Sequence, residues 1–279
     1  MSKNTFWKRN DSYFYYLRTQ RHENRIQKMK RIAVFAILVS CIASMATAQS
    51  KSFIDTSRPD EIVTFGVRAG LNSSGLSNNY IAMQPEMIQN NFYWRMGAQI
   101  GGVADLHIRN FFALQTGLMW ENRSYDCALM AANSSDDYMG SMFVNAKFNY
   151  LHFPVMLSFR FNLLKDLIWQ FDLGGYYAYG VCGKKKQYAY YAYGESEGEL
   201  IFEKNITKTD YFGADSKDFL AVWRSDIGLK IGTGLTVFNH YFIGVYYQRS
   251  LKNIAKQSEG SAPVKIRNCT WNVSLGYNF

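Results

Sequence analysis

The sequence predicts an all-β fold, an eight-stranded antiparallel transmembrane β-barrel with short periplasmic turns and long extracellular loops. Three observations predict it: a two-residue apolar/polar period recurs eight times, short and long connections alternate, and the last strand ends on an aromatic residue. The bulky residues of that strand share one face: Trp271, Val273, Leu275, Tyr277 and Phe279. We expect Trp271, Tyr277 and Phe279 to form the signal that barrel-insertion machinery reads.

Composition agrees with long strands and aromatic girdles. The 279 residues are 16% aromatic and include 21 Gly but only 4 Pro. The net charge of +9 arises mostly at the N-terminus, because residues 1–48 carry nine Lys/Arg and two Asp/Glu, or +7. The remainder has 31 − 9 = 22 basic and 22 − 2 = 20 acidic residues, so the charge gives no support to a nucleic-acid partner.

The N-terminal region has the order of a secretory signal peptide, predicted over residues 29–48. Basic residues precede the apolar run 32–43, and Ala46 and Ala48 supply the small residues before a cleavage site. Residues 1–28 are an upstream extension or a long n-region, and residues 49–61 a short periplasmic segment before the barrel, 62–279. An alternative is lipidation at Cys41, which the continuing apolar run disfavours. A cleaved signal and a barrel together predict the bacterial outer membrane.

In the first four predicted strands, apolar residues that face outward alternate with polar or small residues that face inward. The outward-facing residues are Val63, Phe65, Val67, Ala69 and Leu71 in 62–73; Trp94, Met96, Ala98, Ile100 and Ala104 in 92–106; Phe112, Leu114, Thr116, Leu118 and Trp120 in 111–125; and Leu151, Phe153, Val155, Leu157, Phe159 and Phe161 in 144–161. The second is the weakest, because Gly102 interrupts its outer face. Pro154 cannot donate a ladder hydrogen bond, so we expect a bulge there.

The last four strands follow the same rule. They are predicted over 167–181 (outward Trp169, Phe171, Leu173, Tyr177 and Tyr179), 220–237 (Ile227, Leu229, Ile231, Leu235 and Val237), 241–251 and 265–279. Tight connections lie at 107–110, 162–166 and 238–240; longer ones lie at 74–91, 126–143, 183–219 and 252–264. An even strand count puts both ends of the barrel in the periplasm, with the long loops outside the cell.

Six inward-facing charged residues invite a functional reading: Arg68, Glu121, Arg160, Asp172, Asp226 and Lys230. Side chains fill the interior of an eight-stranded barrel, so we favour a structural ion-pair network over a catalytic or conducting cluster and exclude a wide solute pore. His152 and Ser158 could form a base and nucleophile, but six residues on one strand separate them by roughly 20 Å. We expect no enzyme, cofactor or metal site.

The loop 183–219 opens with three lysines, 184–186, followed by Tyr188, Tyr190, Tyr191 and Tyr193 and an acidic stretch. We favour a hairpin in which the fifth and sixth strands extend beyond the membrane. Contact with anionic glycans, lipopolysaccharide phosphates or nucleic acid is the alternative use of this pattern. Of the cysteines after the signal, Cys127 and Cys182 could pair near the outer rim, whereas Cys269 is expected to act as a small hydrophobe.

Four segments resemble the PorT-like outer-membrane β-barrel family of Bacteroidota: 65–72 (FGVRAGLN), 150–155 (YLHFPV), 249–254 (RSLKNI) and 275–279 (LGYNF). The resemblance implies an eight-stranded barrel but no single activity; the family's namesake takes part in type IX secretion and gliding. We expect a non-enzymatic surface scaffold or interaction protein that binds through its long loops. Alternatives are an accessory component of a secretion complex and a lipid-modifying barrel enzyme. Expected partners are outer-membrane lipid, lipopolysaccharide and the insertion machinery.

Overall fold

The computed structural model describes residues 52–78, 87–133, 138–194, 200–213, 221–256 and 265–279. The predicted signal peptide, with Ala46, Ala48 and the alternative Cys41, lies outside the described residues. Nine strands are present in the described part: β1 (Val63–Asn78), β2 (Met87–Arg109), β3 (Phe112–Asn133), β4 (Tyr138–Leu164), β5 (Leu167–Gly194), β6 (Leu200–Asp210), β7 (Ser225–Val237), β8 (Tyr241–Ser250) and β9 (Ile266–Asn278).

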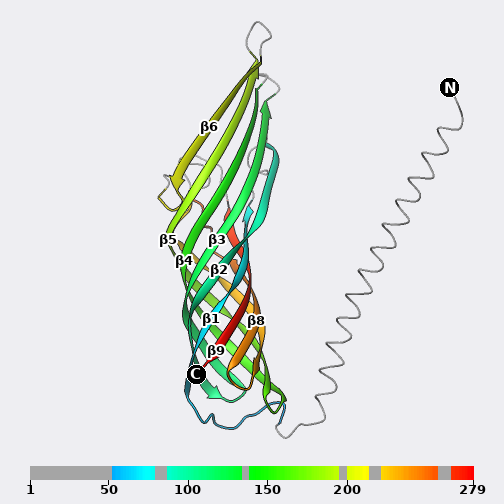
Figure 1. Cartoon of the computed structure of the whole chain (residues 1–279), viewed down its shortest axis with the longest axis vertical. Coiled ribbons are helices and arrows are strands. Elements are labelled where there is room, and N and C mark those ends of the chain that lie inside the picture. Colours follow the sequence, from blue (N-terminus) through cyan, green and yellow to red (C-terminus); the bar gives the residue numbers. More distant parts are fainter. Residues whose placement is uncertain (1–51, 79–86, 134–137, 195–199, 214–220, 257–264) are drawn as a thin grey trace, which may run out of the picture. The chain divides into compact units, whose positions relative to one another are not determined.

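Eight of these strands form a closed antiparallel circuit. Each pairs with two neighbours in the order β4-β3-β2-β1-β9-β8-β7-β5, and β5 returns to β4 (Figure 1). The eight predicted strands correspond to these eight, so the predicted barrel is confirmed. In the part of the chain that the structure describes, no helix is long and apolar enough to cross a membrane.

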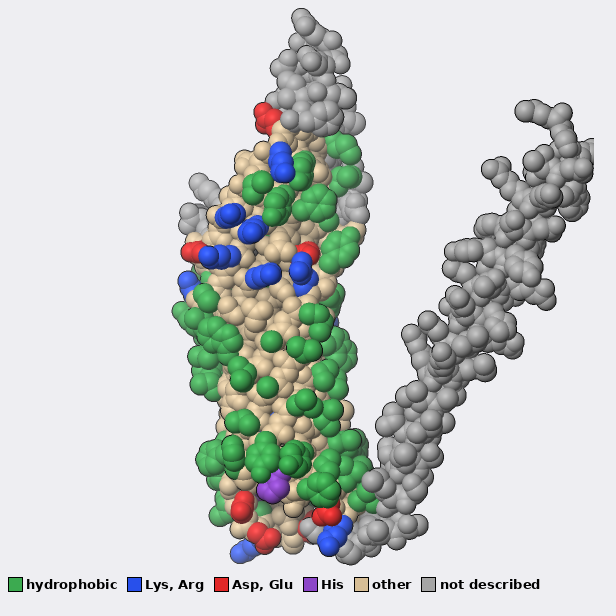
Figure 2. All heavy atoms as spheres, in the orientation of Figure 1, with side chains coloured by type: hydrophobic (Ala, Val, Ile, Leu, Met, Phe, Trp, Pro, Cys, Tyr) green, Lys and Arg blue, Asp and Glu red, His purple; other side chains and the backbone are tan. Residues whose placement is uncertain are grey.

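A belt of exposed apolar side chains covers the outer surface of the periplasmic half of the barrel (Figure 2). On β4 the outward apolar side chains run from Phe161 to Leu151, after which Asn149, Lys147 and Asn145 face outward. The eleven residues from Leu151 to Phe161 make ten steps, which at about 3.3 Å rise and a tilt of about 40° span roughly 25 Å, the height of the apolar band in outer-membrane barrels. The residues of β4 beyond Leu151 therefore lie outside the hydrocarbon core of the membrane.

Several strands extend much further from the membrane than predicted. β3, β4 and β5 continue to or from Asn133, Tyr138 and Gly194, through segments expected to be loops. β6 joins this outer sheet through its pairing with β5. The predicted extended hairpin thus exists, but its return strand is a separate element and not a continuation of β7.

The prediction of a bulge at Pro154 is wrong, because Pro154 pairs with Tyr176 without a change of register. Its missing N–H coincides with a local gap in the β3–β4 ladder, and its carbonyl accepts a hydrogen bond from Thr116 Oγ1 at 3.0 Å. The irregularity lies higher on the same strand, where Asn149 pairs with Cys182 and Tyr150 with Gly180. Val181 is therefore the extra residue of a β-bulge in β5.

Candidate functional site

The periplasmic end of the barrel interior holds one ion pair. Arg160 Nη2 lies 2.7 Å from Asp105 Oδ2, and Gln115 Nε2 donates to Asp105 Oδ1 at 2.8 Å. His107 joins this group through a 3.3 Å contact between its ring nitrogens and Arg160 Nη1. These contacts link three neighbouring strands, β2, β3 and β4, on the inner wall of the barrel.

A second charged group lies deeper in the barrel and is wholly buried. Arg123 donates from Nε and Nη2 to Glu121 Oε2, at 2.9 and 2.5 Å. Arg123 Nη1 also lies 3.7 Å from Asp226 Oδ2. Gln248 Nε2 donates to the same Glu121 oxygen at 2.9 Å, and His152 Nδ1 lies 3.6 Å from Glu121 Oε1. The group joins β3, β4, β7 and β8, strands from opposite sides of the circuit.

All six predicted charged residues point inward: Arg68, Glu121, Arg160, Asp172, Asp226 and Lys230. Among the described residues, however, no two of the six form an ion pair with each other. Asp105 and Arg123, which the sequence reading missed, supply the direct partners. Both have the inward parity of their strands, so the same alternation could have found them.

The other three predicted residues use polar and aromatic partners. Arg68 Nη2 donates to the side-chain oxygen of Asn278 at 2.7 Å, and its guanidinium lies 4.2 Å from the ring centre of Phe242. Lys230 Nζ lies 5.0 Å from the ring centre of Tyr246. The hydroxyl of Tyr246 donates to Asp172 at 2.7 Å. Cation–π contacts and hydrogen bonds therefore take the place of the expected salt bridges.

His152 and Ser158 are both completely buried inside the barrel. Among the described contacts no hydrogen bond joins them: His152 faces Glu121 and lies 4.8 Å from the Tyr176 ring, whereas Ser158 is opposite Asp172 in the sheet. Their burial keeps them away from any surface that a lipid substrate could reach. This arrangement supplies no activated nucleophile.

The outer mouth of the barrel is closed by aromatic side chains. Tyr211 and Phe212, directly after β6, are buried in a cluster with residues of β3, β4 and β5. The Tyr211 ring stacks on Phe148 with centroids 4.2 Å apart, and the Phe212 ring lies 5.4 Å from that of Tyr150. Apolar packing at the mouth and charged packing below it fit a filled barrel and not an open channel.

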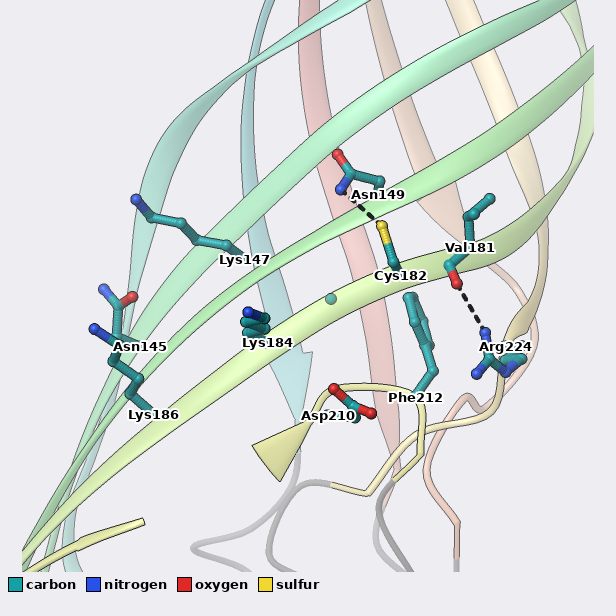
Figure 3. A pocket seen from close by; sticks show the side chains of 11 residues that line it. Asn145, Lys147, Asn149, Val181, Cys182, Lys184, Lys186, Asp210, Phe212 and Arg224 are labelled. Atoms are coloured by element: carbon teal, nitrogen blue, oxygen red, sulfur yellow. Dashed lines mark hydrogen bonds between the residues drawn. The ribbon is translucent and has the colours of Figure 1, made fainter. Parts of the chain in front are cut away.

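A groove of about 500 Å³ lies on the outer wall, above the apolar belt. Polar side chains of β4, β5 and β6 and of the segment before β7 line it, and all but one of the charged ones are basic: Asn145, Lys147, Asn149, Lys184, Lys186, Asp210 and Arg224. Figure 3 shows Lys184 near its centre, with Lys147 and Lys186 to one side and Arg224 to the other. Arg224 Nη1 is fixed by donating to the carbonyls of Gly180 and Val181 at 2.9 and 3.0 Å.

The predicted insertion-signal residues lie on the outward face of the last strand and its terminus. Trp271, Tyr277 and Phe279 are 52%, 37% and 68% exposed. The N–H of Phe279 donates to the carbonyl of Phe65 at 2.9 Å, which attaches the terminus to β1 at the seam of the barrel. Their role as a signal stays a prediction.

The three cysteines in the described residues are free. Cys127 is buried on β3, and burial raises the pKa of its thiol to about 12. Cys182 is exposed on the outer wall, so the two do not form the disulfide that was considered. Among the described residues no group of three His, Cys, Asp or Glu side chains is arranged to hold a metal ion.

A closed eight-stranded antiparallel barrel with an outward apolar belt and a filled polar interior defines a bacterial outer-membrane β-barrel. The chain belongs to the family of the outer membrane protein beta-barrel domain, whose model matches residues 47–256.

No curated protein matches the chain significantly. Among solved structures it is similar to Ail, the attachment invasion locus protein of Yersinia pestis (10% identity, TM-score 0.35, 77% of this chain and 98% of Ail). It is also similar to OprG from Pseudomonas aeruginosa (9% identity, TM-score 0.38, covering 82% and 99%). Neisserial surface protein A gives 13% identity and a TM-score of 0.30, covering 78% and 100%.

Proposed function

We propose that this protein is a non-enzymatic surface interaction protein of the outer membrane, which binds a partner through the outer sheet of β3, β4, β5 and β6. The observation that carries the proposal is the length of these strands beyond the belt. The segment of β4 from Asn149 to Tyr138 alone adds twelve residues, whose eleven steps span roughly 28 Å at the same rise and tilt. Such a projection serves no purpose in spanning the membrane.

The outer sheet offers an available edge. β6 ends the strand order and has only β5 as a neighbour among the described strands. Residues 203–208 of β6 are exposed, including Ile206, which is 49% exposed. An extended edge with unpaired backbone groups is a template to which a partner segment can add as a further strand.

The barrel itself supports a scaffold role. Its interior is filled by charged and aromatic side chains, and His152 and Ser158 are buried apart from each other. Neither feature favours a transporter or a lipid-modifying enzyme. An accessory role in a secretion complex, suggested by the PorT-like resemblance, would require a partner surface on the periplasmic turns or the barrel wall.

In-cell photo-crosslinking tests the proposal. A photoreactive phenylalanine at Ile206 is expected to give a defined covalent adduct on intact cells. The matched control is Leu229, which is equally exposed (52%) but lies in the apolar belt. Adducts only at the periplasmic turn, at Asp166, would favour the secretion-complex role, and no adduct along β6 would reject the proposal.

A further inference from the structure

Four lysines on the outer wall form two directly opposed pairs. Lys147 of β4 faces Lys184 of β5, and Lys186 of β5 faces Lys208 of β6. All four are exposed on adjacent rungs of the same face. Among the described residues none of them forms an ion pair, although Asp210 stands opposite Lys184 in register. Like charges directly opposite each other destabilise a sheet, so this arrangement is unfavourable without an anion.

The lysines lie at a defined height. On β4 the apolar belt ends at Leu151, and Lys147 follows four residues later, roughly 10 Å further along the membrane normal. The headgroup layer of a bilayer extends about 5–8 Å beyond each side of the hydrocarbon core. Since a lysine side chain can bend several ångströms toward that layer, its ammonium reaches the headgroups of the outer leaflet. Figure 2 shows basic side chains gathered on this wall above the belt.

The groove supplies further donors beside the lysines. Asn145 stands on the same rung as Lys186 and Lys208, and Asn149 borders the groove on the belt side. The Asn145 amide donates to Asp126 Oδ1 and the Asn149 amide to Cys182 Sγ, which leaves each NH2 group a second N–H for a ligand. A phosphate monoester carries a charge between −1 and −2 near neutral pH and three strong acceptor oxygens. Ammonium groups and side-chain amides are the donors that such oxygens accept.

We infer that this lysine groove, formed by Lys147, Lys184 and Lys186 with Lys208 opposite Lys186 on the neighbouring strand, binds the phosphate groups of the phosphorylated glycolipid, lipopolysaccharide, in the outer leaflet. Bound phosphate cancels the repulsion in both lysine pairs and joins β4, β5 and β6 at the base of the projecting sheet. The ligand lies beside the barrel at its lipid boundary, whereas the proposed partner edge of β6 is tested at Ile206. The two surfaces adjoin at Lys208, and K147Q/K184Q leaves β6 unchanged, so the two proposals can fail separately.

The test uses the full barrel refolded in lipopolysaccharide-free detergent, with the temperature of heat-induced mobility change on a gel as readout. Added lipopolysaccharide is expected to raise this temperature for the wild type. K147Q/K184Q should lose that increase and bind labelled lipopolysaccharide at least about tenfold more weakly, as expected for lost charged hydrogen bonds. Without the glycolipid the same variant should be at least as stable as the wild type, because a repulsive pair is gone; a merely structural role would lower its stability.

The matched control is R109Q/K165Q, which removes two exposed positive charges at the periplasmic end of the barrel, away from the groove, and should behave as the wild type. Chemically dephosphorylated lipopolysaccharide should give no increase. An unchanged response of K147Q/K184Q, or an equal loss in the control, would overturn the inference. An equal increase with inorganic phosphate alone would show a free-phosphate site and overturn the lipid assignment.

Discussion

Arg123 is the side chain whose loss should destabilise the barrel most. It is fully buried, donates twice to Glu121 and lies 3.7 Å from Asp226. Replacing it with methionine, R123M, keeps most of the length but leaves two buried carboxylates without their cation. Removing one partner of a buried ion pair typically costs about 3–5 kcal/mol. We expect a loss of that size in the free energy of unfolding.

Urea unfolding of the refolded barrel in detergent, followed by tryptophan fluorescence, measures this loss. The control is R95M, because Arg95 and Asp126 form a pair of similar length, 2.6 Å, that is 40% and 34% exposed. An exposed pair contributes about 0–1 kcal/mol. The double variant E121Q/R123M should recover at least about 1 kcal/mol relative to R123M, since one unpaired charge is gone. If R123M costs no more than R95M, the reasoning about the buried group is refuted.

Three further outcomes are expected. Maleimide should label Cys182 rapidly in the folded barrel and leave Cys127 unlabelled until unfolding. Cys127 is buried, and its raised pKa of about 12 keeps the thiol protonated; rapid labelling of both cysteines would contradict this packing. G180A should lower the unfolding temperature by several degrees, since a Cβ there would lie 2.3 Å from ring atoms of Phe212; no change would mean that the mouth packing is easily displaced. F279S should reduce assembly into the outer membrane, measured by fractionation, without affecting export across the inner membrane; normal assembly would reject the insertion-signal role.

The strands that cross the membrane were predictable because their two faces meet different solvents. Lipid outside and packed polar groups inside impose a strict two-residue period, as in the last strand and in β7. Beyond Leu151 the pattern inverts, because the outward face meets water and the inward face packs in an apolar cluster. On β4, Asn145, Lys147 and Asn149 face outward, whereas the residues between them are buried. A search for apolar outward faces therefore assigns most of these outer segments to loops.

The charged interior was predictable in composition but not in its contacts. Parity along each strand places a side chain inside the barrel, yet which residues meet across the interior depends on strand order, tilt and stagger. Glu121 and Asp226 are linked through Arg123, although they are 105 positions apart in the sequence and on strands that do not pair. Long-range pairing of this kind leaves no local pattern in the sequence.

In the lysine groove, a single bulge determines which side chains of β5 face outward. If the alternation that puts Tyr179 outward continued unbroken along β5, Lys185 would face outward and its two neighbours would face the barrel interior. The extra residue at Val181 shifts the parity by one, so that Lys185 is fully buried while Lys184 and Lys186 are exposed. A one-residue shift moves every following side chain to the other face. The bulge thereby places two lysines opposite the lysines of β4 and β6 at headgroup height, which is the arrangement from which the glycolipid site follows.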